Sequence, residues 1–277
     1  MPSIRGMPKR IWTLWTQGLD QMPPVPRACV DTWVIHNPDW DIKVLTGEDL
    51  CDWADPLLCL PKAQSQRPYR LSELARVSLL ARHGGVWVDA TCFCMKPLDE
   101  WLPGCLDSSF FAFDRPGRDR VMASWFLASP PDGYISRRMW EALDGYYLGH
   151  NLSDAGWREL VRKVLDRALN GSTHTTSLWF VPPLPQLGIT PYYSFHYLFN
   201  QLTRTDPVFR DIWERTVKVS ADGPHSLQFH GLARSPSPQI LADIEQRRVP
   251  VYKLDWRIDP AALQASSTLN VLLGRGA

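Results

Sequence analysis

The sequence lacks several features that would place it in a simple class. It has no marked excess of charge, because 30 lysines and arginines stand against 29 aspartates and glutamates, for a net charge of +1. Balanced charge argues against bulk electrostatic binding of nucleic acid, so no nucleic-acid partner is expected. No apolar run approaches the ~18 residues of a membrane span, and the first residues lack the apolar core of a signal peptide. We therefore expect a cytoplasmic protein without a transmembrane segment.

Cysteine is absent beyond residue 105, and no two cysteines form a C-x-x-C pair. Without a secretion signal, free thiols are the expected state of all six cysteines. Cys92 and Cys94 have no further ligands at the spacing of a zinc site, so both are expected to be small core residues.

What is present is the composition of a folded protein, with 44% hydrophobic and 21% charged residues in 277 positions. The first ~95 residues alternate strand patterns and helix patterns, which is typical of an α/β sheet with parallel strands. Strands are predicted at 9–16, 41–45, 86–94, 109–113 and 121–128, and helices at 27–37, 46–53, 69–84, 135–148, 155–169 and 193–201. We expect a single domain over 1–277, with a sheet-bearing part at about 8–130 and a mainly helical part at about 131–277.

One acid interrupts a buried strand pattern. Asp89 lies within the apolar stretch HGGVWVDATCFC, late in its predicted strand. Ligands of open α/β sheets bind beyond the carboxyl ends of strands, and Thr91 would project to the same side as Asp89. A carboxylate with a hydroxyl suits a hard divalent cation, which can bridge to a diphosphate. The residues alone leave a second interpretation equally open, in which backbone amides or an arginine satisfy Asp89.

Several stretches carry a resemblance to a known family. MPKRIWTLWTQG and RLSELARVSLLARHGGVWVDATCFCMKPLDEW, with YYSFHYLFNQL and VYKLDW further along, resemble the bacterial capsular polysaccharide synthesis glycosyltransferases. These are similar to a wider group with the GT-A fold and a DXD sugar motif, which includes yeast-type α-mannosyltransferases and clostridial glucosylating toxins. The resemblance runs from about residue 8 to about residue 256.

The resemblance implies a GT-A-type, Rossmann-like sheet that binds a nucleotide-diphosphate sugar, with a helical C-terminal part on the acceptor side. It further implies a UDP-linked donor, a divalent cation (Mn²⁺ or Mg²⁺), retention of configuration and a glycan acceptor in capsular or surface polysaccharide synthesis. A lipid-linked acceptor would bring the protein to the membrane surface. The alternatives are a protein or small-molecule acceptor, or a catalytically dead glycan-binding module.

The resemblance also implies roles for residues of the first strand and the helix. Trp15 matches the aromatic that stacks on the nucleotide base, and Gln17 beside it is assigned to the donor. The family pattern Ser-Asp-x-x-Arg corresponds here to Ser72-Glu73-x-x-Arg76. Glu73 is therefore expected to bind the donor, and Arg76 to contact the donor sugar and diphosphate and to act in catalysis.

The DXD motif falls on Asp89 and Thr91. Asp89 matches the first acid, so the resemblance makes it a catalytic residue and the metal ligand. Thr91 stands in place of the second acid and is expected to bind the donor, with weaker metal binding or with the donor diphosphate holding part of the metal.

Three further residues are weaker candidates. His225 follows Gly223-Pro224 in a predicted turn that would fold over the donor, although a surface histidine is an alternative. His196 lies in a strongly aromatic helix, where a wall of the acceptor pocket competes with a satisfied core histidine. Trp125 either faces the acceptor or belongs to a core strand.

Overall fold

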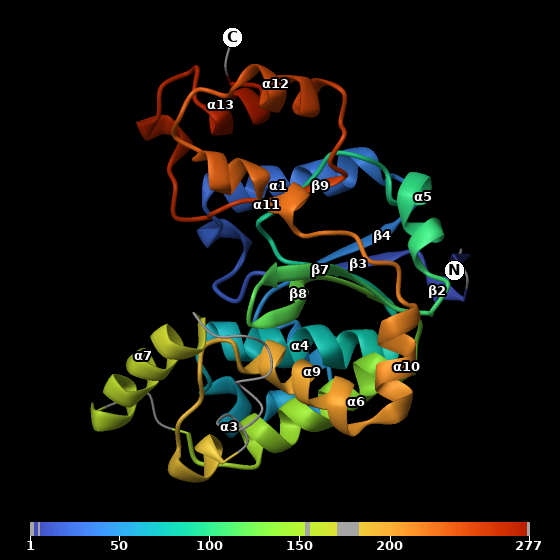
Figure 1. Cartoon of the computed structure of the whole chain (residues 1–277), viewed down its shortest axis with the longest axis vertical. Helices are drawn as coiled ribbons and strands as arrows, with labels where there is room; N and C mark the ends of the chain where they lie inside the picture. Colours follow the sequence, from blue (N-terminus) through green and yellow to red (C-terminus); the bar gives the residue numbers. More distant parts are fainter. Residues whose placement is uncertain (1–2, 5, 153–155, 171–182, 276–277) are drawn as a thin grey trace.

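The computed structural model describes residues 3–4, 6–152, 156–170 and 183–275 (Figure 1). Its central sheet has the strand order β4–β3–β5–β8–β7. These strands are β4 (Asp41–Leu45), β3 (Arg10–Leu14), β5 (Gly85–Val88), β8 (Arg120–Ser129) and β7 (Phe111–Gly117). The α/β class predicted from the alternating pattern is confirmed.

The sheet is mixed, so the expectation of parallel strands is only partly right. β4, β3 and β5 run parallel to one another, whereas β8 is antiparallel to both β5 and β7. The physical reason is the connection: only two residues, 118–119, separate β7 from β8, and so short a loop joins antiparallel neighbours.

The predicted strand at 86–94 is in fact two strands. β5 ends at Val88, and the chain then turns through Asp89 to Thr91 before β6 (Cys92–Cys94) begins. β6 leaves the central sheet and pairs antiparallel with β9 (Val251–Lys253), in a register that sets Cys92 opposite Lys253. Asp89 therefore lies in a turn at the carboxyl edge of β5, not within a strand.

Helices cover both faces of the central sheet (Figure 1). A hydrophobic core lies on each face of the sheet. Successive residues of β3 point to opposite faces, so Trp12 belongs to one buried cluster and Ile11 to the other. The face of Trp12 is covered by α4 (Pro68–His83), α6 (Tyr134–Leu143), α9 (Ser194–Thr205) and α10 (Pro207–Arg215). The opposite side carries α1 (Pro24–His36), α11 (Asp222–His230), α12 (Pro238–Glu245) and α13 (Thr268–Leu272).

The C-terminal part is mainly helical, as predicted, but it contributes helices to both sides of the sheet and also the strand β9. The helices predicted at 135–148, 155–169 and 193–201 correspond to α6, α7 (Gly156–Asn170) and α9. The domain limits at about 8–130 and 131–277 stay a prediction. Among the described residues, the other strands and α-helices are short: β1 (Ser3–Ile4), β2 (Met7–Pro8), α2 (Leu50–Trp53), α3 (Pro61–Gln64) and α5 (Leu98–Trp101).

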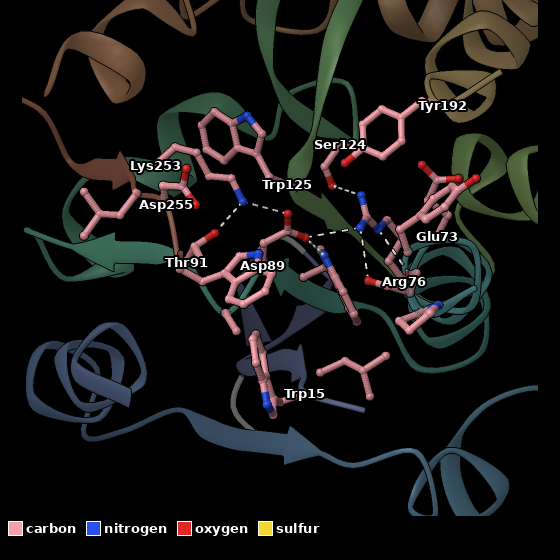
Figure 2. Close-up of a pocket in the computed structure, with 18 of the residues that line it drawn as sticks. Trp15, Glu73, Arg76, Asp89, Thr91, Ser124, Trp125, Tyr192, Lys253 and Asp255 are labelled. Atoms are coloured by element: carbon pink, nitrogen blue, oxygen red, sulfur yellow. Dashed lines mark hydrogen bonds and ion pairs between the residues drawn. The ribbon is translucent and has the colours of Figure 1, made fainter. Parts of the chain in front are cut away.

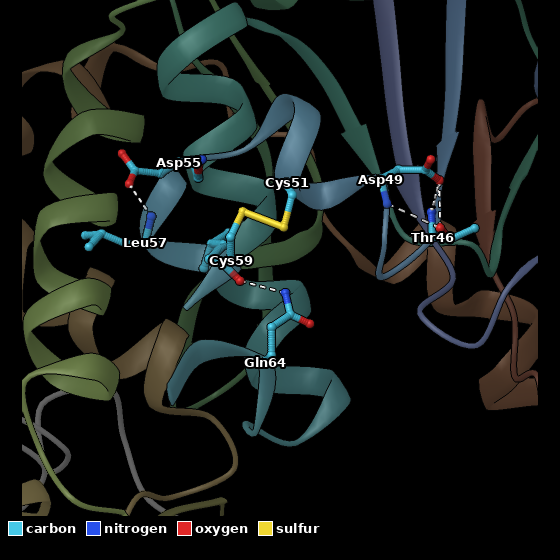
Figure 3. The surroundings of a disulfide bond; sticks show 9 residues. Thr46, Asp49, Cys51, Asp55, Leu57, Cys59 and Gln64 are labelled. Atoms are coloured by element: carbon cyan, nitrogen blue, oxygen red, sulfur yellow. Dashed lines mark hydrogen bonds between the residues drawn. A yellow bond between two sulfur atoms is a disulfide. The ribbon is translucent and has the colours of Figure 1, made fainter. Parts of the chain in front are cut away.

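The expectation that all six cysteines are free thiols is wrong for two of them. Cys51, in α2, forms a disulfide with Cys59 (Figure 3). The short helical turns between them bring their Cα atoms to 5.3 Å, within the range that a disulfide bridges. Cys92 and Cys94 are buried free thiols, as expected of small core residues.

Candidate functional site

A pocket of about 660 Å³ opens at the carboxyl ends of β3 and β5. That volume is in the range of small-molecule sites. All nine residues predicted from the sequence line this pocket: Trp15, Gln17, Glu73, Arg76, Asp89, Thr91, Trp125, His196 and His225. The fold thus brings them together from six separate segments of the chain, while the role of each stays a prediction.

Asp89 is the centre of a network of charges on the pocket floor (Figure 2). Its backbone N–H donates to the Trp125 carbonyl at 2.9 Å, which fixes the turn after β5 against β8. Oδ1 accepts from Trp87 Nε1 at 3.0 Å and from Arg76 Nη2 at 3.2 Å, and Oδ2 accepts from Lys253 Nζ at 2.8 Å. The carboxylate is therefore satisfied by an arginine, an indole and a lysine.

These contacts control the ionisation of Asp89. Burial alone would raise the pKa of its carboxyl group, but the charges of Lys253 and Arg76 outweigh burial and lower the pKa to about 2. Burial would likewise lower the pKa of Lys253, and the charge of Asp89 overrides it and raises that pKa. Both groups are consequently ionised over the whole neutral range.

Arg76 is held on the inner face of α4 by contacts on every side. Nη1 donates to the Ser124 carbonyl at 2.8 Å, and Nη2 donates to Ser72 Oγ at 3.2 Å (Figure 2). The guanidinium also lies 5.3 Å from the ring centre of Trp87 and 5.5 Å from that of Phe195. A planar cation fixed in this way offers a preorganised positive charge to an anion in the pocket.

Glu73 is buried one helical turn before Arg76 on α4. Its Oε2 accepts from the Tyr147 hydroxyl at 2.6 Å. Burial raises the pKa of Glu73 to about 7, against the opposing charge of Arg76 and the hydrogen bond of Tyr147. Glu73 is thus an acid that gains and loses its proton near neutral pH, unlike Asp89. Its predicted contact with the donor stays a prediction.

Trp15 lies at the pocket wall immediately after β3, with the exposed Gln17 close behind it. The Trp15 ring meets the edge of Trp256 at 6.0 Å between ring centres, with 76° between the planes. Trp12, three residues earlier, points to the core and donates Nε1–H to the Gly84 carbonyl at 2.9 Å. The two tryptophans therefore separate into one core residue and one pocket residue.

The predicted turn around His225 is wrong, since this residue lies in helix α11. Gly223-Pro224 suggests a turn, but a proline in the first turn of a helix sacrifices no helical hydrogen bond. His225 still reaches the pocket, where its ring stands edge-on to Trp125 at 5.5 Å. Burial lowers its pKa, against a hydrogen bond with Gln228.

His196 is a buried residue of α9 that also reaches the pocket. Burial lowers its pKa well below the ordinary value, and Arg120 and Arg76 add to the effect. The imidazole is therefore neutral at physiological pH. Its ring packs edge-on to Tyr193 at 5.5 Å, so the same side chain belongs both to the aromatic core and to the pocket wall.

Four buried ring nitrogens of the pocket have no hydrogen-bond partner among the residues that the structure describes. They are Trp15 Nε1, Trp125 Nε1, His196 Nδ1 and His225 Nε2. Buried polar atoms are normally paired, and each exception needs an explanation. All four nitrogens are buried behind the pocket surface, so a ligand would pair with them only after the side chains around them shift.

Lys253 is the principal site residue that the sequence analysis did not single out. It extends from the end of β9, and its Nζ donates to Thr91 Oγ1 at 2.6 Å as well as to Asp89 (Figure 2). A signal was present, because Lys253 interrupts the apolar run Val-Tyr-Lys-Leu much as Asp89 interrupts its own. The pocket as a whole is cationic, with Arg67, Arg76, Arg120, Lys253 and Arg257 against Glu73, Asp89 and Asp255.

The predicted cation does not fit the residues around Asp89 as they are arranged here. Both carboxylate oxygens already accept hydrogen bonds, and the hydroxyl of Thr91 accepts from Lys253. Within the described ranges, no group of three or more His, Cys, Asp and Glu side chains is positioned to hold a metal ion. The expectation of Mn²⁺ or Mg²⁺ therefore stays a prediction that the donor set does not support.

In the part of the chain that is described, no helix combines the length and the apolar character needed to cross a bilayer.

Comparison with known proteins yields a family and several relatives. The family described as "Capsular polysaccharide synthesis protein" matches residues 2–155, more than half of the chain. The O-glycosyltransferase braB of Annulohypoxylon truncatum is 22% identical over 209 residues, which cover 66% of this chain and 45% of that protein. The initiation-specific α-1,6-mannosyltransferase of Candida albicans is 29% identical over 107 residues, covering 35% of this chain and 28% of that protein.

The chain thus spans less than half the length of these curated relatives. Among solved structures, the PaToxG glycosyltransferase is similar with a TM-score of 0.40 and 12% sequence identity, over 98% of this chain and 85% of that one.

Proposed function

This chain belongs to the capsular polysaccharide synthesis protein family, and from that premise we propose that it is a glycosyltransferase that uses a nucleotide-diphosphate sugar. The single observation that carries the proposal is the pocket in which Trp15, Arg76 and the Asp89 network meet. An aromatic platform and fixed cations in one cavity are the features that a nucleotide and its diphosphate require. The names of the relatives, which are all glycosyltransferases, support the same reaction class.

The proposed reaction needs little covalent chemistry from the protein. A hydroxyl oxygen of the acceptor forms a bond to the anomeric carbon as the bond from that carbon to the diphosphate breaks. The leaving diphosphate gains negative charge, which Arg76 is placed to stabilise because its guanidinium is held rigidly in the pocket. For a retaining reaction, we propose that the departing phosphate oxygen takes the proton of the acceptor hydroxyl. In this proposal the pocket holds the two substrates close together.

We propose a UDP-linked donor, with the base stacked on Trp15. The acceptor we propose is a glycan of capsular or surface polysaccharide, on the strength of the family. Two of the relatives are named O-glycosyltransferases, which keeps a small-molecule or protein acceptor as the second candidate. A lipid-linked glycan would bring the protein to the membrane surface. The cytoplasm remains the predicted compartment, although the Cys51–Cys59 disulfide is a feature more common outside it.

A donor screen tests the proposal. Purified protein is mixed with a panel of nucleotide sugars and candidate glycan acceptors, in chelator and in Mn²⁺, and released nucleotide is measured for wild type and Asp89→Asn. We expect wild type to release nucleotide from one donor, and Asp89→Asn to lose at least about 100-fold of that rate. Wild type that binds glycan but releases no nucleotide from any donor would favour a glycan-binding module instead. Release without any acceptor would indicate a hydrolase.

A further inference from the structure

Lys253 is placed on Asp89 by a specific piece of architecture. In the β6–β9 pair, Lys253 lies opposite Cys92, and Cys92 follows Asp89 by three residues in the sequence. A further backbone bond, from Leu254 N–H to the Thr91 carbonyl at 2.8 Å, fixes the residue after Lys253 against the same turn. Backbone hydrogen bonds therefore hold the strand that carries Lys253 against the turn that carries Asp89. The fold itself, and not only the flexibility of the lysine side chain, brings the ammonium to the carboxylate.

The ammonium contacts an oxygen of Asp89, which the resemblance makes the metal ligand, and the hydroxyl of Thr91, which stands in place of the second acid of the motif. Its Nζ is 2.8 Å from Asp89 Oδ2 and 2.6 Å from Thr91 Oγ1. A lysine ammonium has three N–H donors, and contacts with described residues account for two of them. Lys253 also lines the pocket, so the third donor is available to a ligand.

The charges around Asp89 do not balance. One carboxylate is in contact with two cations, Arg76 and Lys253. The next acid, Glu73, interacts with Arg76 but has a pKa of about 7, so part of the excess positive charge remains at neutral pH. Removing charges from water is costly unless they are paired, so a purely structural ion pair is expected to be matched one to one. The excess would repel a divalent cation and attract an anion.

Building on the proposed function, we propose that Lys253 takes the place of the divalent metal: it is the cation that Asp89 and Thr91 hold against the leaving diphosphate, and the enzyme binds nucleoside diphosphate without metal. Asp89 is then a positioning residue for two cations. Thr91 needs no negative charge in this arrangement, because a neutral hydroxyl is enough to orient an ammonium. A second acid at position 91 would be needed by a metal but not by a lysine.

The test begins with wild type and needs no variant. Binding of UDP, with GDP in parallel, is measured by titration calorimetry in EDTA and in Mn²⁺. We expect the two dissociation constants for the preferred nucleotide to agree within about 3-fold. Binding that is at least about 10-fold tighter in Mn²⁺ would overturn the proposal.

Substitution then identifies the cation. Lys253→Met is expected to weaken diphosphate binding at least about 10-fold while leaving uridine, which has no phosphate, unchanged. Lys253→Arg, which keeps the charge, is expected to lose less. The matched control is Lys9→Met, because Lys9 also forms a short ion pair, with Asp99 at 2.6 Å, but does not line the pocket. Diphosphate binding that is the same in wild type and in folded Lys253→Met would overturn the proposal.

The same measurements separate this proposal from the glycosyltransferase function. If UDP or GDP binds and nucleotide is released only in Mn²⁺, the function stands and the role of Lys253 falls. If neither nucleotide binds in either buffer, both fall. Binding and release in EDTA, lost together in Lys253→Met, would support both.

Discussion

Two aspartates of this molecule are each paired with an arginine, but their surroundings differ. Asp119, in the β7–β8 hairpin, has a fully buried side chain and is matched by one cation, Arg120, at 3.0 Å. The Tyr197 hydroxyl completes it at 2.8 Å. The side chain of Asp89 is 26% exposed, opens into the pocket and carries two cations. Pairing with an arginine is common to both, so pairing by itself does not indicate a functional acid.

What distinguishes the two sites is the balance of charge and the access to it. The Asp119 cluster is electrically neutral and its carboxylate is fully buried, although Arg120 itself reaches the wall of the pocket. The Asp89 cluster is positive and open, which suits an anionic ligand better than it suits stability. The two regions are therefore expected to respond in opposite ways to loss of the acid.

The largest effect is expected on stability at Asp119. Asp119→Ala leaves Arg120 without its partner and should lower the free energy of unfolding by about 3–5 kcal/mol. Urea denaturation measures the change. Turnover per folded molecule should fall far less in Asp119→Ala than in Asp89→Asn. An Asp119→Ala protein that is as stable as wild type but inactive would contradict the structural role of Asp119.

Asp89→Asn should act on the reaction instead. The neutral amide no longer holds Arg76 and Lys253 in place, so transition-state stabilisation should fall by at least about 2.7 kcal/mol, or about 100-fold in kcat. The denaturation midpoint should move little, because the pocket remains hydrated. Unchanged kcat would remove Asp89 from the proposed machinery.

Glu73 adds a third acid to the comparison of Asp119 and Asp89. Its hydrogen-bond partner is the hydroxyl of Tyr147, whereas those of Asp119 and Asp89 include cations. Because burial raises its pKa to about 7, the folded protein binds more protons than the unfolded chain between about pH 4.5 and 7. The free energy of unfolding should therefore decrease by about 2 kcal/mol from pH 5 to pH 7 through this group. Glu73→Gln should lack that component, which denaturation at several pH values measures. Identical pH dependence in the two proteins would contradict the raised pKa.

The smallest effect is expected at Trp15, in the wall of the pocket. Trp15→Ala removes the proposed platform for the base, and a lost stacking contact should raise the donor KM by about 10-fold with kcat little changed. Trp256→Ala is the companion variant, since Trp256 touches Trp15 edge-on. A donor KM that is unchanged in Trp15→Ala would rule out base stacking at this position.

Local patterns predicted much of this arrangement. The alternation of strands and helices brings Trp15, Arg76 and Asp89 to one pocket. Trp15 and Asp89 directly follow β3 and β5, and Arg76 lies in the middle of a helix that the sequence marks clearly. Pairings between distant segments were not predictable. Lys253 is 164 residues away from Asp89 in the sequence. The register of β6 and β9 brings them together, and a pattern read over a few neighbouring residues cannot reveal that register. The Cys51–Cys59 bond depends in the same way on how two short helical turns fold together.

The late position of β9 in the sequence has a consequence for synthesis on the ribosome. Every strand of the central sheet leaves the exit tunnel well before Lys253 does, so a nascent chain carries Asp89 and Arg76 without the second cation. A fragment that stops before residue 251 retains the whole family match at 2–155 but not this contact. Such a fragment is expected to fail to bind UDP even where its sheet has formed, so assembly of the pocket has to wait until β9 has been synthesised.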